Sequence, residues 1–555
     1  MALREDGPFG GSLTRRQALR GAGVAGAGLL LPSVLAACGG SASTTGSTAG
    51  SIKHLSLAVD WPGGGPPLDV TRGPATDYLY YTLSASLEGL LFLDKNARLS
   101  SRLAESWSNP DPLTYVFKVR EGVTFWDGTP LRLSDIAYSF TRHQERRWAS
   151  NWSYAFPAFK AVDIDEAKRT ITFRLKEPYV YFAGIAGIVP SYVVRESFAK
   201  AHVKDIGTPS TLTMGTGPFK IANYTPDDRA ELVRNARYWG EKPPIDRLTL
   251  RAIPDDNARL LALQSGEIDG SLIVPPLATD EWAAVPGVRL ITYPTAASWW
   301  AALDRNVKPL DDIHVRRAFA YALDRPGLVQ AAFKGKARLA TTMEPPETWS
   351  NLLSDGEVAD FYKSLPQNEF DLTKARAELA QSSSPNGFTL DVPVETNPVS
   401  EKVMQVWKQG LAKIGVTLNL KSVSSDQYKD MYYNRTKPVP IVINLWGTEY
   451  PDPMWNLDFL LPSENARAGG FNLTNWKSPQ LDRLLAQHKS DPNPRTRAEV
   501  VKQIISMVAE DHGFQFLFWP DQVVAYKTDK VSADGFAWWA RTSSVWPSYF
   551  TPPAT

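Results

Sequence analysis

Strand-like and helix-like patterns alternate along almost the whole chain, and this alternation is the strongest constraint on its fold. Apolar side chains recur at every second position in residues 55–59, 115–119 and 171–175, as they do in strands with one buried face. Between such stretches, residues 256–265 have a helical pattern that ends at Gly266, a residue that commonly terminates helices. We therefore predict α/β lobes between which the chain crosses several times.

Serine residues mark further helix starts. Ser134, Ser400 and Ser478 each precede a helical pattern, and a serine side chain can accept a hydrogen bond from the first turn of a helix. The strand pattern at residues 416–420 follows the second of these helices directly, as an αβ unit requires.

The first 37 residues have the pattern of a secretory signal. Arg15 and Arg16 precede a short apolar run at residues 21–35, and small residues follow it. This run is too short to cross about 30 Å of hydrocarbon, which takes about 20 residues. The arginine pair resembles the twin-arginine export motif, although paired arginines also occur in ordinary signal peptides.

Cys38 is the only cysteine of the chain, and it stands at the cleavage position of this signal. The sequence Leu-Ala-Ala-Cys that ends there resembles a bacterial lipobox, so we predict that Cys38 is lipidated and becomes the first residue of the mature chain. Residues 38–51, rich in Gly, Ser, Thr and Ala, are predicted to be a flexible tether. This places the protein outside the cytoplasm, on the outer face of the cell membrane.

The mature chain would carry almost no net charge. The whole chain has a formal charge of +1, and its first 37 residues hold four arginines against two acidic residues, which leaves about −1. Such a chain has no basic field for nucleic acid. The remaining residues are too many for one core, and a single cysteine forms no internal disulfide.

Short motifs recur in a fixed order along the mature chain, among them Trp-Gly-Thr-Glu-Tyr-Pro-Asp-Pro at 446–453. They lie at residues 68–69, 87–91, 103–107, 115–123, 125–128, 215–219, 235–239, 263–269, 311–318, 321–325 and 446–453. In this order they resemble the extracytoplasmic solute-binding proteins of ABC importers, specifically the dipeptide/oligopeptide/nickel family (family 5).

The resemblance implies an α/β, periplasmic-binding-protein-like (type II) fold with two lobes and a hinge. The ligand would be enclosed between the lobes, and closure would let the permease distinguish loaded from empty protein. The expected division is a first lobe at 52–298 with an inserted subdomain at about 75–212, a second lobe at 299–520, and a return to the first lobe at 521–555.

Glu449 is the first candidate for holding a ligand. It follows the strand-like run 441–446, and open α/β sheets bind ligands at the carboxyl ends of strands. Peptide-binding members of the family have an aspartate here that pairs with the peptide ammonium, so the resemblance implies that role for Glu449, with a longer side chain. The alternative is a surface glutamate in a proline-rich turn.

Five aromatic residues are further candidates for the ligand-binding site. Trp446 and Tyr450 flank Glu449, and Trp446 could equally belong to the core. Trp299 and Trp300 are adjacent on a predicted strand, so they point to opposite faces and at most one lines the cleft. Trp61 follows the first strand. Aromatic rings bind both peptides and sugars, so these residues do not identify the ligand.

The sequence predicts no metal, no cofactor and no catalytic residue. The six histidines show no paired spacing typical of a metal site, and no nucleophile elbow or phosphate loop is present. A secreted hydrolase that uses two carboxylates remains the alternative class.

We therefore predict a monomeric, lipid-anchored binding protein that captures short peptides, or a similar small polar solute, for the permease of an ABC importer. Oligosaccharides, opines and metal chelates are alternative ligands within the same family.

Overall fold

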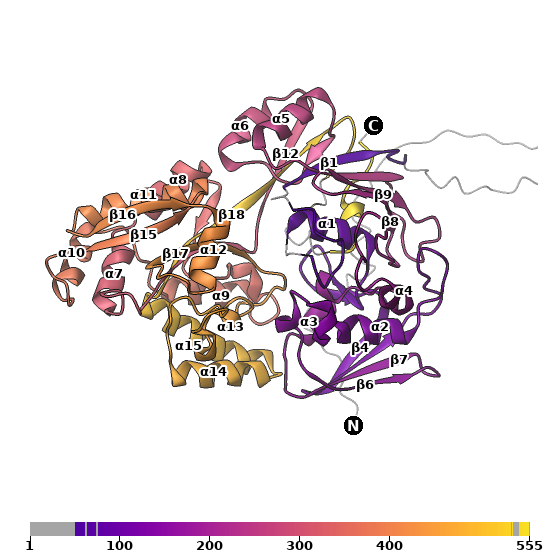
Figure 1. The fold of residues 1–555 in the computed structure, drawn as a ribbon, viewed down its shortest axis with the longest axis horizontal. Helices are drawn as coiled ribbons and strands as arrows, with labels where there is room; N and C mark the ends of the chain where they lie inside the picture. The colour runs from indigo at the N-terminus through magenta and orange to yellow at the C-terminus, as the bar shows by residue number, and fades with distance from the viewer. Residues whose placement is uncertain (1–49, 61–63, 74–75, 534–535, 537–542, 554–555) are drawn as a thin grey trace, which may run out of the picture. The chain divides into compact units, whose positions relative to one another are not determined.

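One long strand, β18 (Phe514–Lys527), joins the two halves of the main sheet in this computed structural model (Figure 1). Its C-terminal half pairs with β12 (Val288–Pro294) and β11 (Gly270–Ser271). Its N-terminal half pairs with β13 (Ala297–Leu303) and β14 (Ala337–Leu339). Since β12 and β13 are consecutive, the chain passes from one half of the sheet to the other between them, and it passes back within β18.

The structure describes residues 50–60, 64–73, 76–533, 536 and 543–553. Four of the residues singled out in the sequence, Arg15, Arg16, Cys38 and Trp61, lie outside these ranges, as does the predicted signal segment.

The first half of the main sheet is built around β1 (Leu55–Val59), which runs parallel to both β10 (Arg247–Ala252) and β11. β9 (Arg229–Arg234) and β8 (Phe219–Thr225) continue the sheet outward from β10. The predicted strand at residues 55–59 is confirmed. All five of its residues are buried, because a central parallel strand has both faces covered.

A separate antiparallel sheet of four strands, in the order β4-β5-β7-β6, is inserted after α1. Helix α2 contacts β6 and β7, as Figure 1 shows. The strands of this inserted sheet, and of the small hairpin before it, are β2 (Leu91–Leu93), β3 (Leu99–Ser101), β4 (Ala104–Asp111), β5 (Thr114–Val119), β6 (Phe159–Asp165) and β7 (Thr170–Leu175).

The second half of the main sheet ends at β17 (Ile441–Gly447), which pairs with β13. Beside it, β15 (Thr389–Glu395) and β16 (Thr417–Val423) form a parallel pair that α11 (Pro398–Ala412) connects. The predicted αβ unit at residues 400–420 is therefore confirmed.

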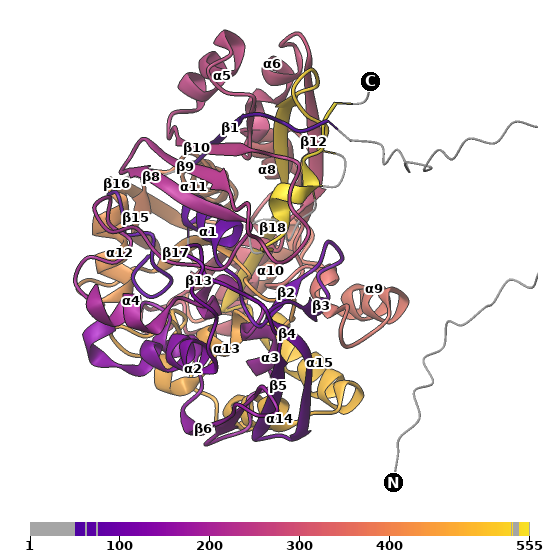
Figure 2. The same ribbon diagram turned by 90° about the vertical axis from the view of Figure 1, so that its right-hand side faces the viewer.

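The remaining helices cover these sheets, and α14 packs against α15 (Figure 2). They are α1 (Asp77–Ser86), α2 (Leu133–Thr141), α3 (Phe182–Ile185), α4 (Glu196–Ala201), α5 (Asp256–Ser265), α6 (Thr279–Ala283), α7 (Ile313–Tyr321), α8 (Arg325–Phe333), α9 (Asp355–Ser364), α10 (Leu372–Ala380), α12 (Ser425–Tyr433), α13 (Leu457–Leu460), α14 (Pro479–Ser490) and α15 (Pro494–Asp511).

The predicted helix boundaries are confirmed in part. Ser478 caps α14, and Gly266 ends α5 in the left-handed conformation with φ of 82°. Ser400 lies inside α11, which Asn397 caps through two backbone N–H groups. Ser134 likewise lies inside α2. The carboxylate of Asp135 accepts a hydrogen bond from the backbone N–H of Arg132, which directly precedes the helix. The predicted starts at Ser400 and Ser134 are therefore wrong, because both helices begin earlier: Asn397 caps α11, and α2 starts at Leu133.

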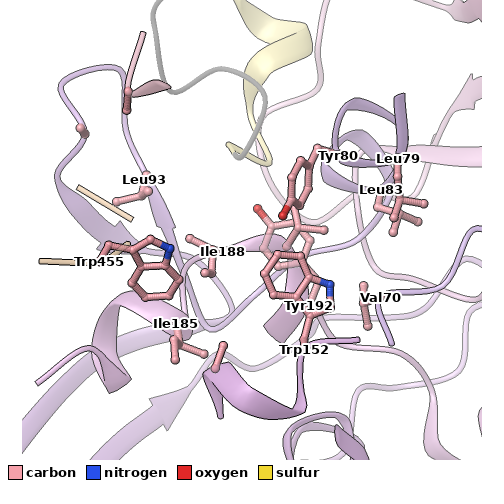
Figure 3. Packing of buried hydrophobic residues seen from close by; sticks show 14 of the residues in the cluster. Val70, Leu79, Tyr80, Leu83, Leu93, Trp152, Ile185, Ile188, Tyr192 and Trp455 are labelled. Atoms are coloured by element: carbon pink, nitrogen blue, oxygen red, sulfur yellow. The ribbon is translucent and has the colours of Figure 1, made fainter. Parts of the chain in front are cut away.

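Within the described part of the chain, buried hydrophobic side chains form one large cluster and two smaller ones. The large cluster contains residues of both the inserted region and the second half of the chain. In Figure 3, Trp455 lies beside Leu93 and Ile185. Apolar packing therefore connects segments that are distant in the sequence.

Candidate functional site

A pocket of about 430 Å³ lies where the chain crosses between the two halves of the main sheet. We call it the hinge pocket. It is lined by Asp60, Asp77, Tyr81, Ile273, Val274, Pro276, Tyr293, Thr295, Ala296, Ala297, Trp299, Phe333, Val399, Leu445, Gly447, Thr448, Pro520, Asp521, Gln522 and Val523. These residues come from the first half, from the crossing strands and from the second half, so a bound molecule would contact all three.

Aromatic rings line the hinge pocket and are held by further rings behind them. Tyr81 meets Trp546 edge-on, with ring centroids 5.1 Å apart. Phe333 and Trp299 both pack against Phe518, at 4.8 and 6.3 Å. Neighbouring side chains therefore fix the orientation of these rings.

The two adjacent tryptophans of β13 face opposite sides of the sheet. Trp299 lines the hinge pocket and is 6% exposed. Trp300 is fully buried and packs edge-on against Trp446 and Phe514, each at a centroid distance of 5.6 Å. Trp300 and Trp446 are not among the lining residues of this pocket, and the alternation of side chains along a strand accounts for the difference.

Glu449 lies two residues beyond the end of β17, next to Thr448, which lines the hinge pocket. Its Oε2 accepts a hydrogen bond of 2.9 Å from Nε1 of Trp455. Glu449 itself is partly buried and is not among the pocket residues. The structure thus brings Glu449 close to the pocket but directs its carboxylate toward the Trp455 indole.

Tyr450 lies at the contact between the second half of the chain and the inserted region. Its ring meets those of Trp455 and Tyr181 edge-on, at 6.1 and 6.4 Å. Burial raises the pKa of its phenol above the ordinary value. A Cβ atom at Gly184 would lie 2.5 Å from the Tyr450 ring, so this close approach requires glycine.

Two acidic residues near the site carry no local signal in the sequence. Glu344 is 1% exposed, and its Oε1 accepts a hydrogen bond of 3.3 Å from the backbone N–H of Asn456. Burial, with the charges of Glu449 and Asp452 adding to it, raises the pKa of Glu344 well above the ordinary value. Asp521 lines the hinge pocket on β18. Only the tertiary structure places either of them here.

Part of the charge in this region is neutralised by ion pairs. Arg497 binds both carboxylate oxygens of Asp452, at 2.7 and 2.8 Å. Nearby, Nε2 of His488 lies 2.8 Å from Oδ1 of Asp458. These pairs lie at the buried contact with Tyr181 of the inserted region and are structural in character.

Within the ranges that the structure describes, no group of three or more His, Cys, Asp or Glu side chains could hold a metal ion. Among these residues, no helix combines the length and the apolar character needed to cross a bilayer.

Residues 98–468 match the model of the bacterial extracellular solute-binding proteins, family 5. The chain belongs to this family. Its members are solute-binding proteins of ABC importers, which confirms the predictions of a binding protein rather than an enzyme and of a place outside the cytoplasm. The alternative of a carboxylate-dependent hydrolase is therefore wrong.

Known members resemble this family 5 chain over most of its length. The glutathione-binding protein GsiB of Escherichia coli (strain K12) is 28% identical over 434 residues, covering 76% of this chain and 81% of GsiB. The structure of DppA from Helicobacter pylori with the peptide STSA has a TM-score of 0.74 at 22% identity, covering 90% of this chain and 97% of DppA. AppA of Bacillus subtilis, bound to a nonapeptide, has a TM-score of 0.72 at 20% identity and covers 91% of this chain and 100% of AppA. The predicted type II fold is confirmed.

Proposed function

We propose that this solute-binding protein captures a short peptide, or a similar small polar solute, in the hinge pocket and delivers it to its permease. One observation carries the proposal: the pocket takes its walls from both halves of the sheet and from the strands that cross between them. A ligand that binds both halves at once stabilises the closed arrangement by its differential affinity.

Peptide is the favoured cargo because of what similar proteins bind. GsiB is named for glutathione, and the DppA and AppA structures contain peptides. We propose that Glu449 pairs with the ammonium of such a ligand, helped by Tyr450, Trp299 and Trp61. A desolvated ammonium–carboxylate pair discriminates strongly, because an unpaired buried carboxylate is costly.

The predicted lobe boundaries are part of this proposal. The first lobe would end at about residue 298, and the chain would return to it at about 521. The pairing of β12 and β13 with opposite halves of β18 supports these positions. We further propose that the protein acts as a monomer.

We propose that the mature protein is anchored by a lipid on Cys38 after export that depends on Arg15 and Arg16. The lipobox-like sequence and the single cysteine support this. In cells that express the full chain, Cys38→Ser should move the protein from the membrane fraction to the soluble or culture fraction. Membrane retention of this variant would contradict the proposal.

A thermal-shift screen tests the cargo. A ligand at 100 times its dissociation constant adds about 2.7 kcal/mol to stability, which raises the melting temperature by a few degrees. We expect di- and tripeptides to raise it and oligosaccharides and opines to leave it unchanged. A shift with sugars or opines but none with peptides would overturn the peptide assignment.

A further inference from the structure

All of the charged residues among the described lining of the hinge pocket are acidic. They are Asp60, Asp77 and Asp521. Asp60 and Asp77 come from the N-terminal region and Asp521 from the crossing strand β18, so they approach the pocket from different sides. The potential inside such a pocket favours a positive charge.

Asp521 is the acidic lining residue that the crossing strand β18 contributes. It is half-buried, and within the described residues no side chain donates a hydrogen bond to it or forms an ion pair with it. Burial raises the pKa of its carboxyl above the ordinary value. The carboxylate has therefore lost part of its hydration, and no hydrogen-bond donor among the described side chains replaces it.

Three charged side chains act on Asp521 from neighbouring positions: Lys336, Arg338 and Glu347. Arg338 is held by Glu347, with N–O distances of 2.7 and 3.3 Å, and none of the three lines the pocket. Asp60 lies 3.8 Å from Arg259, which also pairs with Asp256. Arg338 and Arg259 are thus each shared with another carboxylate, and no cation is among the described lining residues.

The aromatic lining adds a second attraction for a cation. Tyr81, Tyr293, Trp299 and Phe333 all border the pocket. A guanidinium or ammonium group over an aromatic face is attracted by the ring quadrupole, and guanidinium groups in addition stack on such faces.

We infer that the hinge pocket receives a cationic group of the cargo, so that the preferred ligand is a basic short peptide rather than a neutral or acidic one. The inference rests on the proposed function, because it assumes that the cargo occupies this pocket. A basic peptide also differs from glutathione, whose one cationic group is its ammonium and which has no basic side chain.

The test compares three tripeptides by isothermal titration calorimetry with the purified mature chain. Ala-Arg-Ala and Ala-citrulline-Ala have nearly the same shape and differ in charge, and Ala-Glu-Ala reverses the charge. We expect the arginine peptide to bind at least about tenfold more tightly than the citrulline peptide, and the glutamate peptide to bind most weakly. Equal affinities would overturn the inference and leave the peptide function standing.

If none of the tripeptides binds, the peptide function and the preference for a basic peptide both fail. Agmatine, which carries a guanidinium without a peptide bond, then tests whether the hinge pocket receives a cationic group. Binding of agmatine supports that part of the inference, and absence of binding overturns it.

Asp521→Asn removes the charge at constant shape. We expect this variant to lose most of the preference for arginine over citrulline while its affinity for the citrulline peptide changes little. Asp360→Asn is the matched control, because Asp360 is exposed on α9 and does not line the pocket. If Asp521→Asn does not fold, Asp60→Asn replaces it, since that side chain is half exposed. An unchanged preference in the folded variant would overturn the role of the carboxylate.

Discussion

The phenol of Tyr181 donates a hydrogen bond of 2.6 Å to Oδ2 of Asp458. Tyr181 directly precedes α3 in the inserted region, and Asp458 lies in α13 of the second half of the chain. Oδ1 of the same carboxylate contacts His488 at 2.8 Å and Lys489 at 3.6 Å. Burial alone would raise the pKa of Asp458, but the charges of His488 and Lys489 hold it below the ordinary value. A charged carboxylate thus links two distant segments.

Replacing Tyr181 by Phe should weaken this link. A hydrogen bond to a charged acceptor contributes about 1.5–3 kcal/mol, so the free energy of unfolding should fall by about that amount. Ligand affinity should fall several-fold because the inserted region is held less firmly. Chemical denaturation and calorimetry measure the two effects. Tyr179→Phe is the control, since the Tyr179 hydroxyl donates a hydrogen bond to the Ala155 carbonyl within the inserted region. Equal losses of affinity in both variants would count against a linking role.

Replacing Glu449 by Gln should weaken ligands that carry a free ammonium by about tenfold or more. The amide oxygen can still accept the hydrogen bond from Trp455, so stability should change little. Binding of one peptide with a free and with an acetylated amino terminus measures the effect. Glu369→Gln, at an exposed position, should behave as wild type. If Glu449→Gln keeps its preference for the free amino terminus, Glu449 does not hold the ammonium.

The two tryptophans of β13 should respond differently to replacement by Phe. Trp300→Phe leaves a cavity in the core and should lower the free energy of unfolding by about 1–3 kcal/mol. Among the described residues, no acceptor bonds to Nε1 of Trp300. The loss of stability therefore comes from the smaller side-chain volume and not from a broken hydrogen bond. Trp299→Phe should lower ligand affinity more than stability, because Trp299 lines the hinge pocket. Denaturation and binding measurements on both variants distinguish the tryptophan that faces the hinge pocket from the one that faces the core. Equal effects on binding would contradict this assignment.

His143 should make the protein less stable in acid. The Nε2–H of its ring donates to the Pro190 carbonyl, Nδ1 accepts from the Ser150 hydroxyl, and both distances are 2.7 Å. Burial lowers the pKa of His143 to about 3. Below about pH 6.5 the unfolded chain therefore binds a proton that the folded chain does not. The stability that depends on neutral His143 is fully present above that pH and is lost as the pH falls toward 3.

When the pH falls from 7 to 5, His143 alone should lower the free energy of unfolding by about 2 kcal/mol. Urea unfolding of the wild type and of His143→Gln at both pH values measures the difference, and the variant should show the shallower pH dependence. His54→Gln is the control, since His54 is exposed. An identical pH dependence in His143→Gln and wild type would show that His143 is not the group responsible.

Two of the confirmed predictions from the sequence concern helix ends. Gly266 ends α5 and Ser478 caps α14, because a left-handed residue and a side-chain cap depend only on neighbouring residues. The errors at Ser134 and Ser400 are also local. In both places the helix begins before the serine: α2 starts at Leu133, and Asn397 caps α11. Several polar residues near each start could serve as the cap, and the sequence alone does not rank them.

The sequence by itself determined the alternation of strands and helices, the family and the placement of Glu449 just after a strand, because periodicity and motif order are properties of neighbouring residues. The tertiary structure alone decided that Trp299 rather than Trp300 lines the hinge pocket. It also decided that Asp521 lies in the same pocket as Asp60 and Asp77, from the opposite end of the chain. Such contacts depend on strand pairing over long distances, which leaves no periodic signal around any single residue.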